Sequence, residues 1–122
     1  MKKEIIYYCS FSMSPPESVE LLDNNEGKII NDSGEKIVDL QEHKILHFWD
    51  KMDELQVWKW KKEYYPKYEI LDGHQWELKL RNRKGRIRNF GGHMSYPDNY
   101  NDFIKELNNL FGSEIQDEKY EI

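Results

Sequence analysis

The alternation of apolar and charged residues from Trp76 to Leu80 constrains the fold more than any other feature of this chain. Trp76, Leu78 and Leu80 share one side of an extended strand, and the residues between them are charged. A turn at 82–85 separates this strand from a second one at 86–90, which predicts an antiparallel hairpin with one buried face. A sheet that is apolar on one side needs a covering layer, so helices are expected on that side.

Two segments have the helical spacing that such a covering layer requires. Apolar residues recur at helical intervals through about 40–54, where Asp39 is the expected N-cap. A second helix is predicted at about 99–111, ending before Gly112. Its apolar stripe consists of Tyr100, Phe103, Ile104, Leu107, Leu110 and Phe111. Both helices are therefore predicted to pack on the sheet.

Four further segments have the composition or alternation of strands. They lie at 4–13, 19–22, 28–30 and 55–61. Short turns join most of them, which favours antiparallel pairing. The sequence thus predicts an α+β fold, in which an antiparallel sheet of about five to six strands is covered on one face by two helices. The expected order is β-β-β-α-β-β-β-α.

Length and cysteine content restrict the class of protein. The 122 residues suit one domain, expected to span 1–112, with an acidic flexible tail at 113–122. The single cysteine, Cys9, excludes an intramolecular disulfide and indicates a reducing compartment. No apolar run approaches the roughly 18 residues of a membrane span, and no signal-peptide core is evident. A cytoplasmic location without membrane contact is therefore expected.

Positive charge is concentrated in one part of the chain. The net charge is −5, yet residues 59–88 contain ten Lys/Arg and four Asp/Glu. The cations of the predicted hairpin are Lys79, Arg81, Arg83, Lys84, Arg86 and Arg88. They could bind phosphates or an acidic partner. Alternatively, they form the solvated outer face of the sheet, paired with acidic neighbours.

Aromatic residues alternate with lysines just before the hairpin. The aromatic residues are Trp58, Trp60, Tyr64, Tyr65 and Tyr68. They could form a stacking platform for single-stranded nucleic acid or a protein contact patch. A place in the core is favoured for the two tryptophans, which leaves Tyr64 and Tyr65 as the better candidates for partner contact.

No catalytic or metal-binding motif stands out. His43 and His47 lie four residues apart on the first predicted helix, but no third metal ligand is evident. The chain lacks a nucleophile motif and a phosphate-binding glycine loop. Neither a metal nor a cofactor is predicted, and the protein is expected not to be an enzyme. A hydrolase without a sequence signature is a third, weaker hypothesis.

A pattern of aromatic, glycine and asparagine residues runs through 58–111. It reads Trp-x-Trp and Tyr, then Asp-Gly-x-x-Trp-x-Leu, then Gly-x-Asn-x-Tyr-Pro-x-Asn-aromatic-x-x-Phe. The matching residues are Trp58, Trp60, Tyr64, Asp72, Gly73, Trp76, Leu78, Gly92, Tyr96, Pro97, Asn99, Tyr100 and Phe103. The chain thereby resembles uncharacterised small proteins of low-GC bacteria and their phages, with Met94 in place of the first asparagine. The resemblance implies a common fold and no particular activity.

The favoured function is a non-enzymatic, protein-binding inhibitor or immunity-type factor. Its basis is the small size, the charge polarity and the lack of a catalytic motif. Size and composition, together with the phage setting of the similar proteins, suggest a phage or mobile-element inhibitor of a host nuclease-based defence, as an anti-CRISPR protein would be. The partner is expected to be a protein or ribonucleoprotein whose basic channel meets the acidic helices. The alternative is a nucleic-acid or nucleotide-binding module that uses the hairpin at 79–88.

Overall fold

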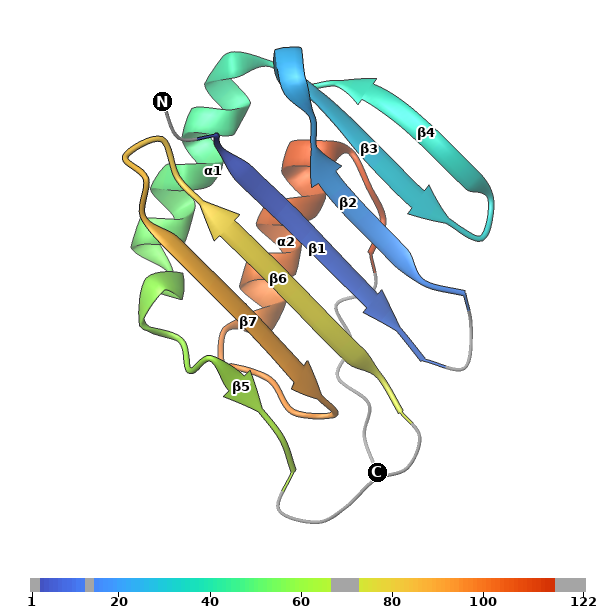
Figure 1. Ribbon diagram of the computed structural model, residues 1–122, viewed down its shortest axis with the longest axis vertical. Helices are drawn as coiled ribbons and strands as arrows, with labels where there is room; N and C mark the ends of the chain where they lie inside the picture. The colour runs from blue at the N-terminus through green and yellow to red at the C-terminus, as the bar shows by residue number, and fades with distance from the viewer. Residues whose placement is uncertain (1–2, 13–14, 67–72, 116–122) are drawn as a thin grey trace.

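All strands belong to one seven-stranded sheet in the computed structural model, which describes residues 3–12, 15–66 and 73–115 (Figure 1). The elements in chain order are β1 (Ile5–Phe11), β2 (Glu17–Leu21), the 3-10 turn η1 (Asp23–Asn25), β3 (Glu26–Asn31), β4 (Gly34–Asp39), α1 (Glu42–Glu54), the 3-10 turn η2 (Val57–Lys59), β5 (Glu63–Tyr64), β6 (Gln75–Arg81), β7 (Ile87–His93) and α2 (Tyr100–Phe111).

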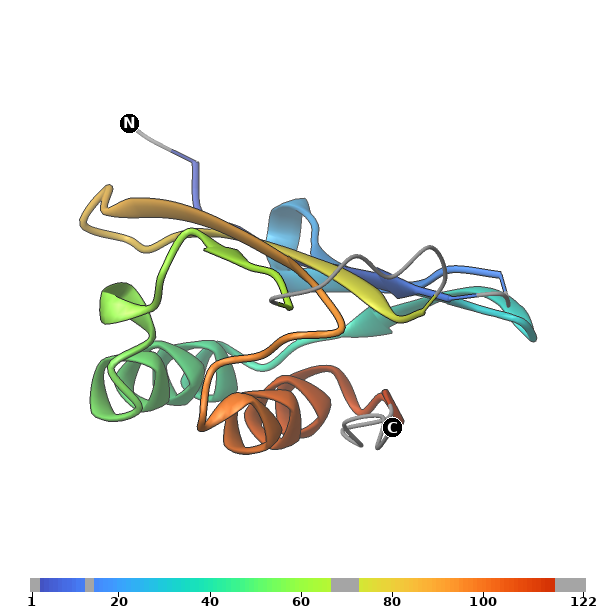
Figure 2. The same cartoon turned by 90° about the horizontal axis from the view of Figure 1, so that it is seen from below.

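The sheet is open and almost entirely antiparallel. The strand order is β4-β3-β2-β1-β6-β7-β5, and only the short β5 pairs in parallel, with β7. Figure 2 shows α1 and α2 side by side on the same face of the sheet. The prediction of an α+β fold with two helices on one face is confirmed, with a slightly higher strand count than expected.

The alternation in the sequence decides which side chains form the core. Trp76, Leu78 and Leu80 are buried in β6, and the residues between them are exposed. The β1–β6 register places Tyr8 opposite Leu78 and Ile6 opposite Leu80, which extends the buried rows onto the central strand. The whole predicted stripe of α2 is buried, and its aromatic residues pack on this face of the sheet. The core therefore lies between the sheet and the two helices.

The segment after α1 is not the strand that its alternation predicted. Gln56 has a left-handed backbone with φ 57°, and Val57–Lys59 forms the η2 turn. Because the chain turns here, Val57, Trp58 and Trp60 all reach the core from a segment that is not extended. The spacing of the apolar residues predicted correctly that these side chains are buried, but it predicted the wrong backbone conformation.

Three other local predictions were wrong. The sequence indicated no strand at β4, an edge strand that exposes nearly all of its side chains. Asp39 ends this strand, and the N-cap of α1 is instead Gln41, without a capping side-chain bond. The return strand, predicted at 86–90, instead continues through Gly91 and Gly92 to His93.

The indole N–H groups of the tryptophans fasten distant segments to one another. The donor and acceptor pairs are Trp49 with Glu4 Oε2, Trp58 with Asp53 Oδ1 at 2.7 Å, Trp60 with Asn99 Oδ1 at 2.9 Å and Trp76 with the Ser95 carbonyl oxygen at 3.0 Å. A buried donor without an acceptor costs about 1–3 kcal/mol. These bonds therefore fix where the segments around the core lie.

The chain remains packed through Ile115, at the start of the predicted tail. Ile115 is buried, and the Asn108 side chain bonds both its backbone N–H (2.9 Å) and its carbonyl oxygen (3.0 Å). Gly112 adopts φ 70° and ends α2, as predicted. The rest of the tail, 116–122, lies outside the described residues.

Candidate binding surfaces

The cations of the predicted basic hairpin do not share one surface. Arg88 lies opposite a buried leucine of β6, so its side chain is on the helix-covered face, whereas Lys79 and Arg81 are on the open face. The Arg88 guanidinium donates to the backbone oxygens of Trp58 and Trp60, the latter at 2.8 Å. Arg88 thus fastens η2 to β7 and is not available to a partner.

Arg83, at the tip of the hairpin, is held by two carboxylates. It donates to Glu42 through both terminal nitrogens, at 2.7 and 2.8 Å, and to Glu4 through Nε at 3.1 Å. The hydrogen bonds from Arg83 lower the pKa of the Glu42 carboxyl, and those to Glu42 raise the pKa of the guanidinium. The pairing attaches the hairpin tip to the start of α1.

A different set of cations has no acidic partner within the described ranges. These cations are Lys59, Lys61, Lys62, Lys84 and Arg86, all of them exposed. Arg86 lies over the Trp58 ring at 5.0 Å, and the Lys62 carbonyl oxygen accepts the Gly91 N–H. These five cations therefore lie in η2, just before β5 and at the hairpin turn, and not together on the outer face of the hairpin.

The predicted aromatic platform is largely part of the core. Trp58 and Trp60 are buried, as was favoured for them, and Tyr68 lies outside the described residues. Tyr64 is half-buried, and its hydroxyl accepts the Lys61 backbone N–H at 3.0 Å. Tyr65 is 62% exposed. Among the described members of the platform, Tyr64 and Tyr65 are therefore the ones with surface left for contact.

The face of the sheet opposite the helices carries an apolar line along its central strand. Ile5, Tyr7, Cys9 and Phe11 of β1 alternate with the buried residues and so lie on this open face. Exposed apolar side chains on the same face of the outer strands are Ile37 and Ile87, which sequence analysis did not single out.

Charged residues of both signs border this line, with an acidic excess. By strand register, the acidic side chains on the open face are Glu20, Glu26, Glu35, Asp39, Glu63 and Glu77, and the basic ones are Lys28, Lys79 and Arg81. Burial, the Cys9 hydrogen bond and nearby acidic groups raise the pKa of Tyr7 to about 12. The open face is therefore both apolar at its centre and net negative at its border.

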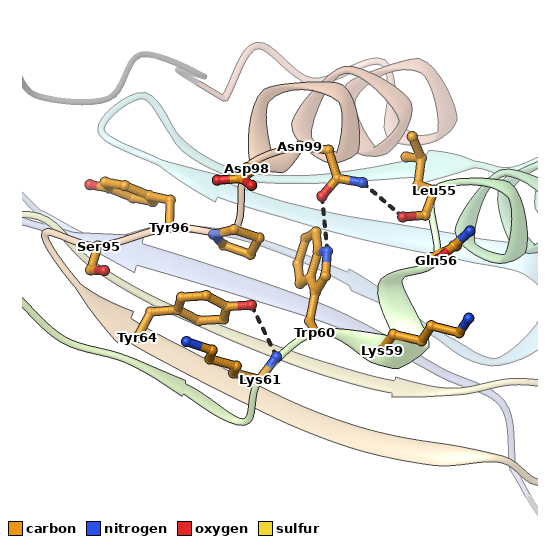
Figure 3. A pocket seen from close by; sticks show the side chains of 11 residues that line it. Leu55, Gln56, Lys59, Trp60, Lys61, Tyr64, Ser95, Tyr96, Asp98 and Asn99 are labelled. Atoms are coloured by element: carbon orange, nitrogen blue, oxygen red, sulfur yellow. Dashed lines mark hydrogen bonds between the residues drawn. The ribbon is translucent and has the colours of Figure 1, made fainter.

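A pocket of about 700 Å³ opens where η2, β5 and the β7–α2 loop meet (Figure 3). Lys59, Lys61 and Tyr64 line the side formed by η2 and β5, and Tyr96 and Asp98 line the side formed by the loop. Sequence analysis named Tyr64 as a contact residue and Tyr96 only as part of the aromatic, glycine and asparagine pattern.

Hydrogen bonds between the walls set the shape of this pocket. The Asn99 side chain accepts from the Trp60 indole and donates to the Leu55 carbonyl oxygen at 2.7 Å, as the dashed lines of Figure 3 show. The Trp76 indole donates to the Ser95 carbonyl oxygen behind the loop. The pocket is therefore built by the fold itself.

The described part of the chain holds no candidate metal centre and no helix that could cross a bilayer. Groups of three or more His, Cys, Asp or Glu side chains in metal-binding arrangement are absent from it. Its helices are all too short or too polar to span a membrane. Comparison of the sequence and structure with protein-family models, curated proteins and solved structures found no significant match.

Proposed function

We propose that the protein is a non-enzymatic inhibitor that docks its open sheet face onto a basic surface of another protein. The observation that carries the proposal is the apolar line along β1, which the fold leaves uncovered by either helix. Inhibition follows because a docked protein excludes whatever that basic surface otherwise binds.

The apolar content of the open face supports a protein partner. Phe11, Ile37 and Ile87 are 42%, 48% and 46% exposed. Exposed apolar patches with a polar border are typical of surfaces that bind other proteins. The half-buried Tyr7 lies near the centre of this face, and tyrosine is enriched at binding hot spots.

The charge of the open face supports a basic partner. Two of its three cations are paired within the chain, Lys28 with Glu35 at 3.4 Å and Lys79 with Glu77 at 3.3 Å. The remaining carboxylates and the chain's net charge of −5 would repel a polyanion and attract a positively charged protein surface. Channels that bind nucleic acid are such surfaces, which fits an inhibitor of a nuclease-based defence.

The hairpin alternative has weaker support. Arg83 and Arg88 are engaged in bonds within the chain, so the hairpin does not present one continuous cationic face. Arg81, Lys84 and Arg86 have no ion pair among the described residues, but Arg81 lies on the open face and the other two flank the turn, so they do not form one phosphate site.

Affinity capture with matched variants tests the proposal. The tagged protein is incubated with nuclease-treated lysate of its host, and bound proteins are identified and quantified. Phe11→Glu and Ile37→Glu place a charge on the open face, and both should abolish capture of a stoichiometric protein with a basic surface. Leu46→Glu changes a comparably exposed residue, 44%, on α1 and should leave capture intact. Capture that survives both open-face substitutions would contradict the proposal.

A further inference from the structure

The pocket between η2, β5 and the β7–α2 loop lies apart from the open face and has a chemistry of its own. We propose that it binds a phosphorylated nucleoside, either as a free nucleotide or as the phosphorylated end of a nucleic-acid strand. The base would lie against the aromatic walls and the phosphate at the lysine side of the mouth.

The aromatic walls suit a planar ring. The Tyr64 ring packs on Trp76 at 5.9 Å between centroids, and its hydroxyl is held by the Lys61 backbone N–H. On the opposite wall, the Tyr96 ring packs on Tyr100 at 4.8 Å. Rings fixed in this way can accept a base by stacking without losing side-chain freedom on binding.

The charges at the mouth suit a ligand with an anionic end and a hydrogen-bonding end. Lys59 and Lys61 are exposed and have no acidic partner in the part of the chain that the structure describes. Asp98 lies on the other wall and is exposed, and a carboxylate accepts hydrogen bonds from base amino groups or sugar hydroxyls. A purely apolar ligand would leave these groups unused, and inorganic phosphate alone would leave the aromatic walls uncovered.

The pocket is formed before any ligand arrives. Gln56 on one wall and Met94, which precedes the other, have φ 57° and 53°, a region that non-glycine residues rarely occupy. Such strain is concentrated at ligand sites and persists only where the surroundings enforce it. Here the Lys59 N–H bonds the Gln56 carbonyl oxygen at 3.0 Å, and the Met94 N–H bonds the His74 carbonyl oxygen at 2.9 Å. The volume of about 700 Å³ is within the usual range of ligand pockets.

An NMR titration of the full chain with adenosine monophosphate and uridine monophosphate tests the assignment. Saturable shifts of the Tyr64 and Ser95 amides are expected, and adenosine, which lacks the phosphate, should bind at least about tenfold more weakly. The double substitution Lys59→Glu/Lys61→Glu should weaken nucleotide binding by a similar factor. Lys36→Glu/Lys105→Glu changes the charge equally at two exposed positions outside the pocket and should leave binding unchanged.

Two results would overturn the assignment. One is the absence of saturable shifts at millimolar nucleotide, and the other is equal weakening by the pocket and control substitutions. A short oligonucleotide with and without a terminal phosphate then separates the two sources of the ligand. Tighter binding of the phosphorylated strand than of the mononucleotide indicates a strand end, and the reverse order indicates a free nucleotide. These substitutions leave the open face intact, so protein capture tests the proposed function independently.

Discussion

Replacing Asn99 with alanine should lower the free energy of unfolding by about 1.5–4.5 kcal/mol, because this side chain joins three segments. Its oxygen accepts from the Trp60 indole at 2.9 Å, and its nitrogen donates to the Leu55 carbonyl oxygen at 2.7 Å. Asn99 itself precedes α2, yet it makes no side-chain capping bond to that helix. The expected loss therefore arises from the bonds between segments and not from helix capping.

The magnitude follows from how buried each partner is. Trp60 is only 7% exposed, so in the variant its indole N–H would have neither an acceptor nor water. Leaving that donor unsatisfied costs about 1–3 kcal/mol of stability. Leu55 is half-buried beside the pocket, where water can replace the lost donor, so its share is about 0.5–1.5 kcal/mol. Stabilities of small domains are about 5–15 kcal/mol, so the loss is large enough to measure reliably.

Urea unfolding followed by circular dichroism measures this loss. Asn109→Ala makes the same chemical change on the exposed side of α2 and should alter stability by no more than about 0.5 kcal/mol. A double-mutant cycle with Trp60→Phe should give a coupling of about 1 kcal/mol between the two side chains. If Asn99→Ala is as stable as Asn109→Ala, or if the coupling is zero, the reasoning from these contacts is refuted.

Other substitutions test the packing and the ion pairs. Gly92→Ala should lower the free energy of unfolding in urea by more than about 2 kcal/mol, because the added methyl group would lie 2.8 Å from a backbone oxygen. Gly91→Ala is the matched control, since its methyl group would make an ordinary contact of 3.5 Å. Arg88→Ala, which loses two bonds to carbonyl oxygens, should destabilise by about 2–3 kcal/mol, and Arg86→Ala, which loses an exposed ring contact, by under about 1 kcal/mol. The pKa of Glu42 is lowered in the folded protein, so its contribution is present above about pH 4.5 and is lost as pH falls through the folded value. The stability difference between wild type and Glu42→Gln should therefore shrink on acidification from pH 6 to pH 3, and a constant difference would contradict the ion pair.

Helices and strands were predictable where the sequence pattern itself shows which side chains are buried. The stripe of α2 and the alternation of β6 each place apolar side chains on a single face, and both elements formed as expected. The β4 strand escaped notice because it exposes almost every side chain and is held by backbone pairing with β3. The η2 turn was mistaken for a strand because its backbone conformation depends on one left-handed residue, Gln56. The spacing of apolar side chains does not reveal such a residue.

The candidate sites were less predictable, because contacts between distant residues decide which charges are free. The hairpin cations looked equivalent in sequence, yet the β6–β7 register places Arg88 on the covered face. Arg83 finds its partners Glu4 and Glu42 at separations of 79 and 41 residues. The segment in which lysines and tyrosines alternate, 59–64, forms one wall of the pocket, although the sequence pattern predicted no pocket there. The second wall of the pocket forms where the β7–α2 loop packs against η2 and β5, and no local sequence pattern predicts that packing.

The tryptophans of the aromatic and lysine-rich segment are used mainly in the core. In isolation, Trp58 and Trp60 beside lysines resemble a stacking platform, but their indole N–H groups are both satisfied within the fold. Their partners, Asp53 and Asn99, lie at the end of α1 and the start of α2, so the aromatic segment connects the two helices. Trp60, although held in this way, is itself part of the pocket wall. We therefore propose function for groups that keep exposed surface among the described residues, namely the apolar line of β1 and the cations beside the pocket.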